Sequence, residues 1–276
     1  MKLIFPNCTL DKPAPLVMGI LNVTPDSFSD GGRFQKLSDA VDRANAMADA
    51  GADIIDVGGE STRPGADAVG EEEEMARVIP VITRIKKARN IPVSIDTYKE
   101  RVARTAVQDA GADMINDISA LRFGAGMADT VARLRVPVVL MHIKGHPKIM
   151  QESPRYDDVI IEIRSYFEER IEFALARGIA REKIILDPGI GFGKRVEDNI
   201  AIIRRLRQFQ YFDLPLMVGV SRKTFLGKIA GETVAEKRMG ETLTAQIVAI
   251  LNGASIIRTH DVKETIASIK IMKALL

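Results

Sequence analysis

The stretch Gly51-Ala52-Asp53-Ile54-Ile55-Asp56 decides the fold, because it recurs with variations at two later places in the chain. The later copies are Gly111-Ala112-Asp113-Met114-Ile115-Asn116 and Gly253-Ala254-Ser255-Ile256-Ile257-Arg258. In each copy a glycine suited to ending a helix precedes a short apolar run suited to a buried parallel strand. A polar residue then follows where the strand would stop. We therefore expect these polar residues to emerge together at one end of a parallel sheet, where α/β proteins build their active sites.

Eight short apolar segments, with stretches of helical spacing between them, indicate eight βα units. The expected strands are 17–21, 54–57, 93–95, 114–115, 138–141, 184–186, 216–220 and 255–257. Eight such units in about 250 residues predict an α/β fold, namely a single (β/α)8 TIM barrel domain over residues 1–276. The alternative is a doubly wound sheet, which usually has fewer strands and a phosphate-binding glycine fingerprint after one of them.

Local signals add detail to the predicted barrel. Residues 1–16 precede the first strand, and we expect a short lead-in strand pair there that plugs the bottom of the barrel. Ser38 and Asp39 are typical N-cap residues, and the acidic run 71–74 is typical of the first turn of a helix. No Ser/Pro-rich or low-complexity stretch separates two halves, so we expect one domain.

The composition excludes several classes of function. The chain has 39 basic and 37 acidic residues, and this near balance gives no reason to expect a nucleic-acid or membrane-surface partner. Its longest apolar runs are far shorter than the roughly 20 residues that span a bilayer. A single cysteine, Cys8, leaves no intrachain disulfide, which is typical of a reducing compartment. We therefore expect a cytoplasmic protein.

Polar side chains follow nearly every predicted strand, and they divide into two groups. The first group suits the edge of a heterocycle that carries an amide and an amino group, and it consists of Asp96, Asn116, Asp187 and Lys223. The second group offers cations around a hydrogen-bonding side chain, and it consists of Arg63, Arg258 and His260 near Asn22. Cations in this arrangement suit a phosphate. Together the groups predict a nucleotide-like or pterin-like substrate.

Each residue taken singly has a structural alternative. Asp96 could cap a helix, Asn116 could serve the barrel backbone, and His142 and His260 could be ordinary surface histidines. The glycine run 189–193 fits neither common phosphate-loop motif and could be a tight turn. No cluster of cysteine or histidine has the spacing of a zinc site, whereas Mg²⁺ held partly by substrate phosphates would leave almost no trace in a sequence.

Seven long motifs of the chain resemble those of the dihydropteroate synthase family, the pterin-binding TIM barrels of folate synthesis. They cover residues 18–32, 56–65, 94–97, 115–118, 186–194, 219–225 and 258–262. The resemblance implies an enzyme that condenses 6-hydroxymethyl-7,8-dihydropterin diphosphate with 4-aminobenzoate and releases diphosphate. It also implies a Mg²⁺ cofactor and a homodimer paired through helices on the side away from the active-site loops.

The same resemblance implies a role for each matching residue. The pterin would be held by Asp96, Asn116, Asp187 and Lys223, with Met141 and Phe192 packed near it. The diphosphate would be held by Asn22, Arg63, Arg258 and His260, with Asn22 as the Mg²⁺ ligand. The aminobenzoate site would be shaped by Thr62, Pro64, Phe28, Ser221 and Lys223, and Gly219 would also line the substrate site. The residues expected to carry catalysis are Asp96, Lys223, Asn22, Arg258 and His260.

Two loops carry further expectations. Asp30 and Arg63 have opposite charges on two long loops of the same face, so we expect them to pair when both substrates are bound. Phe28 and Pro64 stand as they do in a sulfonamide-sensitive member of the family, which implies inhibition competitive with aminobenzoate. The chain departs from the family pattern in residues 143–147, which read Ile-Lys-Gly-His-Pro, and at Thr259.

Two other functions are compatible with part of the pattern. A methyltransferase that uses methyltetrahydrofolate would need the pterin pocket but neither the Thr62-Arg63-Pro64 segment nor Ser221-Arg222-Lys223. A catalytically inactive pterin-binding paralogue would be expected to lose residues of the anion site, whereas this chain keeps Asn22, Arg63, Arg258 and His260. Both comparisons favour the active synthase.

Overall fold

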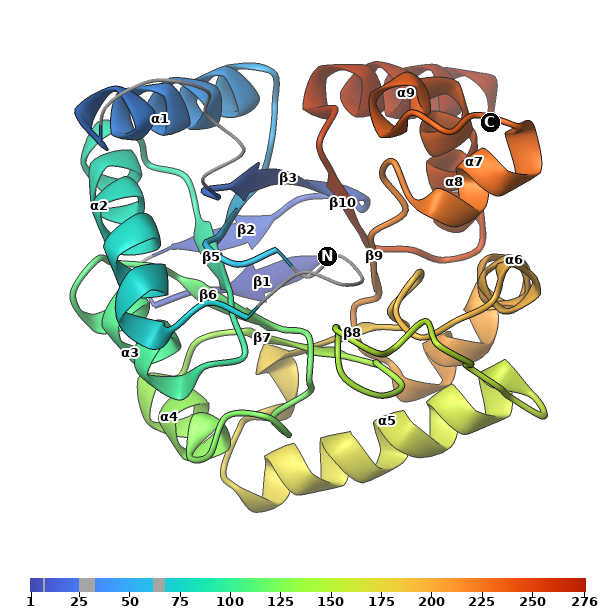
Figure 1. Cartoon of the computed structure of the whole chain (residues 1–276), viewed down its shortest axis with the longest axis horizontal. Coiled ribbons are helices and arrows are strands. Elements are labelled where there is room, and N and C mark those ends of the chain that lie inside the picture. The colour runs from blue at the N-terminus through green and yellow to red at the C-terminus, as the bar shows by residue number, and fades with distance from the viewer. Residues whose placement is uncertain (7, 25–32, 62–67) are drawn as a thin grey trace.

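Eight parallel strands surround the centre of the molecule and confirm the predicted barrel (Figure 1). The computed structural model describes residues 1–6, 8–24, 33–61 and 68–276. The strands are β3 (Leu16–Asn22), β4 (Ile54–Gly58), β5 (Val93–Asp96), β6 (Met114–Asp117), β7 (Val138–Met141), β8 (Ile184–Asp187), β9 (Met217–Val218) and β10 (Ile256–Thr259). Neighbours in the chain pair in parallel from β3 to β8, and β10 pairs with both β3 and β9. A parallel bridge between Leu186 and Leu216 closes the ring.

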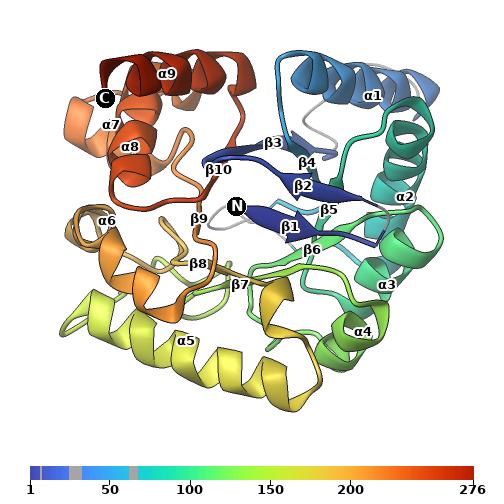
Figure 2. The same ribbon diagram turned by 180° about the vertical axis from the view of Figure 1, so that it is seen from behind.

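Helices cover the outside of the barrel, as both ribbon views show (Figures 1 and 2). They are α1 (Arg33–Asp49), α2 (Glu71–Ala88), α3 (Glu100–Gln108), α4 (Met127–Leu134), α5 (Val159–Ala176), α6 (Val196–Arg204), α7 (Thr224–Ala230), α8 (Met239–Leu251) and α9 (Val262–Leu275). The apolar stripe of α5 is typical, since Ile163 and Phe167 are fully buried against the barrel. Within the described ranges, no helix is long and apolar enough to cross a membrane.

The helix starts confirm one prediction and correct another. The acidic run forms the first turn of α2, as expected. The N-cap prediction for Ser38 and Asp39 was wrong, because α1 already begins at Arg33 and these residues lie inside it. Serine and aspartate are common caps, but a helix interior tolerates them when they face solvent, and both are exposed here.

The bottom of the barrel is closed by the predicted strand pair. Strands β1 (Lys2–Ile4) and β2 (Thr9–Asp11) pair in antiparallel fashion and lie across that end (Figure 2). Leu3 and Phe5 from this segment are buried in a cluster with inward-facing residues of seven barrel strands. Those residues are Leu16, Met18, Ile54, Met114, Val139, Ile185, Met217 and Ile256. The lower half of the barrel interior is therefore apolar and packed.

The repeated segment ends a helix in each of its three copies. Gly51, Gly111 and Gly253 all adopt positive φ values, of 101°, 84° and 103°. Glycine adopts this backbone region at little cost, whereas a residue with a Cβ atom is strained there. Each glycine therefore lets the chain leave a helix and enter the next strand, as the repeat predicts.

The third residue of each copy has a structural role that the sequence analysis did not assign. Its side chain accepts a hydrogen bond from a backbone N–H at the start of the neighbouring strand. The three bonds join Val17 N to Asp53 Oδ2 (2.8 Å), Val93 N to Asp113 Oδ2 (2.8 Å) and Leu216 N to Ser255 Oγ (3.4 Å). Each copy thus ties the entry of its own strand to the strand beside it, which fixes the strand register.

Candidate active site

The upper half of the barrel interior is lined by polar side chains. Side chains alternate along a strand, so the residue two positions beyond an inward apolar residue also faces inward. Ile54 is followed in this way by Asp56, and Met114 by Asn116. The same holds for Met141, Asp187, Gly219 and Arg258. Asn22 and Asp96 also face inward, because both pair in register with Gly58, two positions beyond Asp56. A polar ring therefore lies directly above the packed apolar layer, at the carboxyl ends of the strands.

The last residues of the three repeat copies are in direct contact within this ring. Oδ2 of Asp56 accepts a hydrogen bond from Nδ2 of Asn116 at 3.0 Å and another from Nε of Arg258 at 2.6 Å. The three residues come from β6, β4 and β10, which are alternate strands of the barrel. The expectation that they emerge together is confirmed. Asp56 is fully buried and was not among the predicted site residues, although its place in the repeat identifies it.

Arg258 connects this contact to Asp96. Its second terminal nitrogen (Nη2) donates to Oδ2 of Asp96 at 2.6 Å. Burial raises the pKa of Asp96 to about 7, because it outweighs the opposing effect of the guanidinium, and the charge of Asp56 acts in the same direction as burial. For Arg258, burial disfavours the charged form, but the two carboxylates outweigh it and raise the pKa further. The guanidinium therefore stays charged between two carboxyl groups.

Asn22 lies close to Asp96. A Cβ atom added to Gly58 would lie 3.5 Å from Cβ of Asp96 and 3.7 Å from Oδ1 of Asn22. Because glycine stands there, the amide oxygen of Asn22 and the carboxylate of Asp96 border the same small space. The predicted anion-binding asparagine is thus brought next to the predicted catalytic aspartate.

Asp187 and the loop after β8 form the opposite side of the ring. Oδ1 of Asp187 accepts a hydrogen bond from the backbone N–H of Gly189 at 2.7 Å. Burial raises the pKa of Asp187 to about 6, although this hydrogen bond and the ammonium of Lys223 oppose the shift. The ammonium of Lys223 lies 4.2 Å from the ring centroid of Phe192, a cation–π distance.

An apolar wall stands beside these polar groups. Met141 and Phe192 belong to one buried cluster, whose other members are Ile118, Ile143 and Met150. Oδ1 of Asn116 and Oδ1 of Asp56 are buried and have no hydrogen-bond partner within the described part of the chain. A buried acceptor without a partner costs free energy, so these atoms are suited to receive donors from a ligand. An apolar wall beside such acceptors fits a planar, hydrogen-bonding ring.

His260 and Ser221 form a second pair on the rim. Oγ of Ser221 lies 3.0 Å from Nδ1 of His260 and accepts the backbone N–H of His260 at 3.2 Å. Burial lowers the pKa of His260 to about 3, and the nearby charges of Arg258 and Arg222 act in the same direction. The expectation of a cationic His260 was therefore wrong: burial next to two arginines keeps the imidazole neutral. A neutral imidazole carries one ring proton, so Nδ1 of His260 either accepts from the serine hydroxyl or donates to it, depending on the tautomer.

Arg222 stabilises the two loops that carry Ser221 and His260. Its guanidinium donates to both carboxylate oxygens of Asp261, at 3.1 Å and 2.5 Å, and so joins the loop after β9 to the loop after β10. Gly219 lies on the same side, where an added Cβ would be 3.8 Å from Cβ of Arg258. The structure therefore brings Gly219, Ser221, Arg258 and His260 to one side of the ring, whereas the side chain of Lys223 lies against the loop after β8.

Five of the predicted or paired residues lie outside the described residues. They are Phe28, Asp30, Thr62, Arg63 and Pro64. The expected Asp30–Arg63 pair and the loop part of the aminobenzoate site therefore stay predictions.

The residues that depart from the family pattern have ordinary structural partners. The imidazole of His146 stacks on Phe123, with ring centroids 4.2 Å apart. Nζ of Lys144 donates to Glu162 at 3.0 Å and lies 4.1 Å from the ring centroid of Tyr156. Thr259 is fully buried, and its Oγ1 accepts the backbone N–H of Asp261 at 3.2 Å. None of these four contacts involves a residue of the polar ring.

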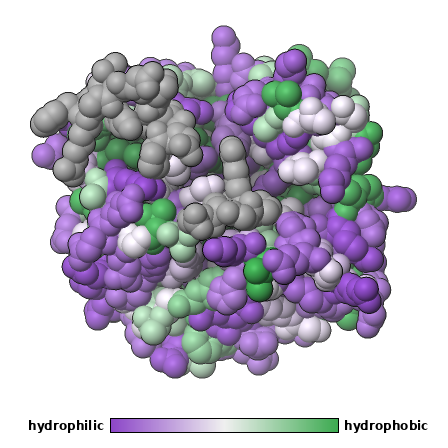
Figure 3. Space-filling view, in the orientation of Figure 1, coloured by the Kyte–Doolittle hydropathy of each residue, from purple (hydrophilic) through white to green (hydrophobic). Residues whose placement is uncertain are grey.

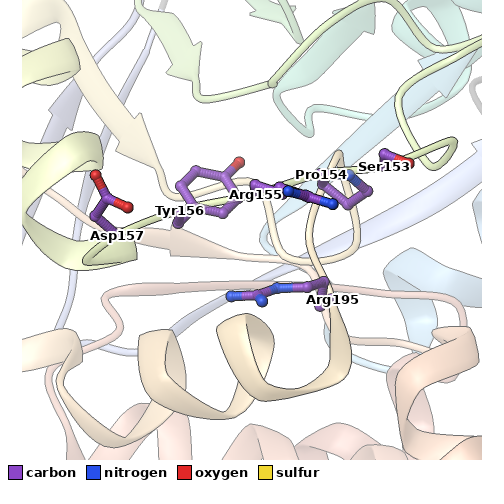
Figure 4. A pocket seen from close by; sticks show the side chains of 6 residues that line it. All are labelled: Ser153, Pro154, Arg155, Tyr156, Asp157 and Arg195. Carbon is purple, nitrogen blue, oxygen red and sulfur yellow. The ribbon is translucent and has the colours of Figure 1, made fainter.

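A hollow on the surface lies beside the segment 153–157 and the start of α6 (Figure 4). Its lining residues are Ser153, Pro154, Arg155, Tyr156, Asp157 and Arg195. Arg195 donates to Asp198 at 2.9 Å. No predicted site residue lines this hollow, so it is separate from the polar ring.

We expect the substitution Gly189→Ala to be strongly destabilising. Gly189 has a φ of +65°, and an added Cβ would lie 1.9 Å from the carbonyl oxygen of His142. Gly231 is a matched control, because its φ is +79° and an added Cβ would meet no described atom within 4 Å. In urea unfolding, Gly189→Ala should lose about 1–3 kcal/mol more than Gly231→Ala, the usual cost of overpacking. Equal losses for the two variants would contradict this close approach.

The polar ring and the apolar wall beside it define a TIM-barrel enzyme with a site for a planar, hydrogen-bonding substrate at the carboxyl ends of its strands. The family model described as "Pterin binding enzyme" matches residues 18–260. The dihydropteroate synthase of Escherichia coli strain K12 is 49% identical over 276 residues, which is 100% of this chain and 97% of that protein.

Solved structures agree with these matches. The Yersinia pestis dihydropteroate synthase in a sulfonamide drug complex is 45% identical, with a TM-score of 0.93 and coverage of 100% of this chain and 99% of that chain. The Xanthomonas albilineans enzyme in complex with 7,8-dihydropteroate is 40% identical, with a TM-score of 0.90 and coverage of 100% and 98%. The chain belongs to the family of pterin-binding enzymes, and within it to the dihydropteroate synthases.

Proposed function

We propose that the chain joins 6-hydroxymethyl-7,8-dihydropterin diphosphate to 4-aminobenzoate and releases diphosphate, which yields 7,8-dihydropteroate. The observation that carries this proposal is the contact of Asp56, Asn116, Arg258 and Asp96 in one ring beside an apolar wall. The likeness to dihydropteroate synthases over the whole chain supports it.

The polar ring suits the edge of the pterin. Oδ1 of Asn116 and the carboxylate of Asp187 would accept hydrogen bonds from the N–H and amino groups of the ring. The ammonium of Lys223 would donate to a ring acceptor, while its stem lies against Gly191, whose added Cβ would be 3.1 Å from Cδ of Lys223. Met141 and Phe192 would pack against the ring.

The proposed reaction breaks the bond between the methylene carbon and the diphosphate oxygen. The bonding electrons leave with diphosphate, so a cation forms at the methylene carbon. The ionised carboxylate of Asp96 would stabilise this cation, and the amino nitrogen of 4-aminobenzoate would attack the carbon and then lose a proton to solvent. Arg258 would take up part of the charge on the leaving group, and neutral His260 would donate a hydrogen bond from Nε2 in the tautomer that carries its proton there.

The residues present fit a Mg²⁺ ion bound together with the substrate. Asn22 offers a neutral amide oxygen beside the carboxylate of Asp96, and hard oxygen donors of this kind suit Mg²⁺ that is otherwise held by phosphate oxygens. When bound, the ion would neutralise charge on the departing diphosphate. Among the described residues no group of three acidic, histidine or cysteine side chains forms a complete metal site.

An omission assay tests the proposed function. Purified protein is incubated with Mg²⁺, dihydropterin diphosphate and 4-aminobenzoate, and each is left out in turn. The proposal expects diphosphate release and dihydropteroate formation only when all three are present. Binding of the pterin without release above a no-enzyme control would overturn it and indicate the inactive paralogue.

We expect sulfonamides to inhibit this chain by competing with 4-aminobenzoate. The complex of the Yersinia pestis relative with a sulfonamide drug motivates this expectation, and such drugs share the aniline ring of the substrate. In steady-state assays the drug should raise the KM for 4-aminobenzoate and leave kcat unchanged. Inhibition that grows with rising 4-aminobenzoate would contradict it.

We further propose that the chain is a homodimer and works in the cytoplasm, where its single cysteine would remain reduced. Exposed apolar side chains gather on α7 to α9 and the segment that follows α7, in the upper right of Figure 3. They are Ile229, Val234, Val248, Leu251, Ile271 and Leu275. Several large apolar side chains exposed on neighbouring helices favour a protein interface there.

The dimer proposal predicts a change of mass. Ile271→Glu places a charge on this surface and should shift the protein from dimer to monomer in light scattering. Ile161→Glu on α5 is the matched control, because Ile161 is exposed to 61% and Ile271 to 62%. A monomeric wild-type protein, or an equal effect of the two substitutions, would contradict the interface.

A further inference from the structure

Lys194 is a buried charged residue for which the proposed reaction has no role. It follows the glycine loop 189–193, and its side chain is only 3% exposed. Its Nζ lies 2.9 Å from Nδ1 of His142, 3.1 Å from the carbonyl oxygen of Phe192 and 3.4 Å from the carbonyl oxygen of His142. The three donors of the ammonium therefore have three neutral acceptors.

This arrangement is costly for a residue that only fills space. Within the described part of the chain, Lys194 forms no ion pair, so its charge is compensated by neutral acceptors alone. Burial lowers the pKa of Lys194 to about 7, although the charge of Asp187 opposes the shift. An apolar side chain of the same length would avoid this desolvation cost. An apolar side chain could not, however, donate the hydrogen bonds that Lys194 makes to His142 and Phe192.

The hydrogen bonds of Lys194 join two loops that already lie in close contact. The backbone of the β8–α6 loop approaches the β7–α5 loop closely at both ends of the glycine run, since added Cβ atoms at Gly189 and Gly193 would collide with carbonyl oxygens. Nε2 of Gln151 donates to the carbonyl oxygen of Gly191, and the hydroxyl of Tyr156 donates to that of Gly193, each at 2.7 Å. Lys194 adds its hydrogen bonds on the buried side of this contact between the two loops, which we call the seam.

The seam holds two groups of the pterin site. The loop contributes the backbone N–H of Gly189, which orients Asp187, and it carries Phe192, whose ring lies beneath the ammonium of Lys223. Phe192 is tied to Lys194 directly through its carbonyl oxygen. A shift of this loop would therefore move the acceptor for the pterin edge and the wall for its face together.

We propose that Lys194 is a positioning residue for the pterin half of the site, which acts through His142 and the carbonyl of Phe192 without touching the substrate. The inference rests on the proposed function, because it assigns the residue to pterin binding. The inference predicts different effects on the binding of the two substrates. The seam borders the residues proposed to bind the pterin, whereas Ser221 and His260 lie on loops that are held together by Arg222 and Asp261.

His142 provides a matched pair of test variants. It is buried, and burial together with the charge of Lys194 lowers its pKa well below the usual value, so the imidazole is neutral and Nδ1 accepts from the ammonium. His142→Asn keeps an acceptor near the position of Nδ1, while His142→Leu removes it. Lys194→Met keeps the length of the lysine stem and removes all three donors.

The experiment measures the Kd of dihydropterin diphosphate by calorimetry without 4-aminobenzoate, and then both KM values during turnover. Lys194→Met and His142→Leu should each weaken pterin binding about tenfold or more, since small displacements of a binding group are costly. The KM for 4-aminobenzoate should change less than twofold, and His142→Asn should restore most of the pterin affinity. The double variant Lys194→Met/His142→Leu should lose no more than either single variant, which is the signature of one shared interaction.

Three results would overturn the inference. They are an unchanged pterin Kd in Lys194→Met, equal proportional losses for both substrates, and additive losses in the double variant. If Lys194→Met does not fold, the comparison of His142→Leu with His142→Asn decides, because both retain the lysine. A wild-type protein that bound no pterin would instead overturn the proposed function, and with it this inference.

Discussion

Replacing Arg258 with methionine is expected to abolish turnover and to lower the free energy of unfolding by about 3–5 kcal/mol, the usual cost of breaking a buried ion pair. Arg258 donates to both Asp56 and Asp96 at 2.6 Å, and Asp56 is fully buried. Without the guanidinium, two carboxyl groups face each other in the barrel with no cation between them. Urea unfolding and the diphosphate-release assay measure the two effects.

An exposed ion pair supplies the control for this prediction. Arg177 pairs with Asp129 at 3.1 Å, and the two side chains are 49% and 60% exposed. Surface pairs contribute roughly 0–1 kcal/mol, so Arg177→Met should leave both stability and turnover nearly unchanged. If Arg258→Met were as stable and as active as Arg177→Met, the central role of the ring would be refuted.

Asp96→Asn is expected to reduce turnover by about 10²–10³-fold, the usual loss when one electrostatic contact to a transition state is removed. The amide keeps the size of the carboxyl group but not the charge that would stabilise the methylene cation. In the wild-type protein, turnover should also fall as the pH drops through about 7, because burial raises the pKa of Asp96 to that value and protonation removes the same charge. Pterin affinity and turnover, measured separately, distinguish the chemical loss from a binding loss.

The same group gives a stability prediction of definite sign. The folded pKa of Asp96 lies above its ordinary value of 3.8, so the folded state binds this proton more tightly than the unfolded state. The resulting stabilisation is fully present below about pH 4 and is lost as the pH rises through about 7. As the pH rises from about 4 to about 7, the free energy of unfolding should therefore decrease less in Asp96→Asn than in the wild-type protein. Parallel pH curves for the two proteins would show that Asp96 is ionised throughout.

Much of the barrel could be predicted from the sequence, because its signals are local and periodic. The glycine that ends a helix and the apolar run that follows it lie within six residues, and they placed the strands correctly to within one or two residues. The ninth strand shows the limit of this approach. The apolar run 216–220 predicted five residues, but only Met217 and Val218 pair as a strand, since the chain then turns toward the site.

The candidate site was predicted less completely, because several of its contacts join residues that are far apart in the chain. Asp56 and Arg258 are 202 positions apart, and a polar residue at a strand end does not reveal which partner it meets. The neutral state of His260 follows from burial beside two arginines, which a single histidine in a sequence does not indicate. Lys194 and His142 escaped prediction for the same reason, since they meet only when two loops pack together.

The threefold repeat has a consequence for the evolution of drug resistance. Within six residues, each copy ends a helix, anchors a neighbouring strand and supplies one member of the Asp56–Asn116–Arg258 contact. A substitution selected to evade an inhibitor bound at this contact would fall in a segment on which strand register and helix exit also depend. Inhibitors directed at the Asp56–Asn116–Arg258 contact would therefore leave fewer viable escape mutations than inhibitors that depend on the rim.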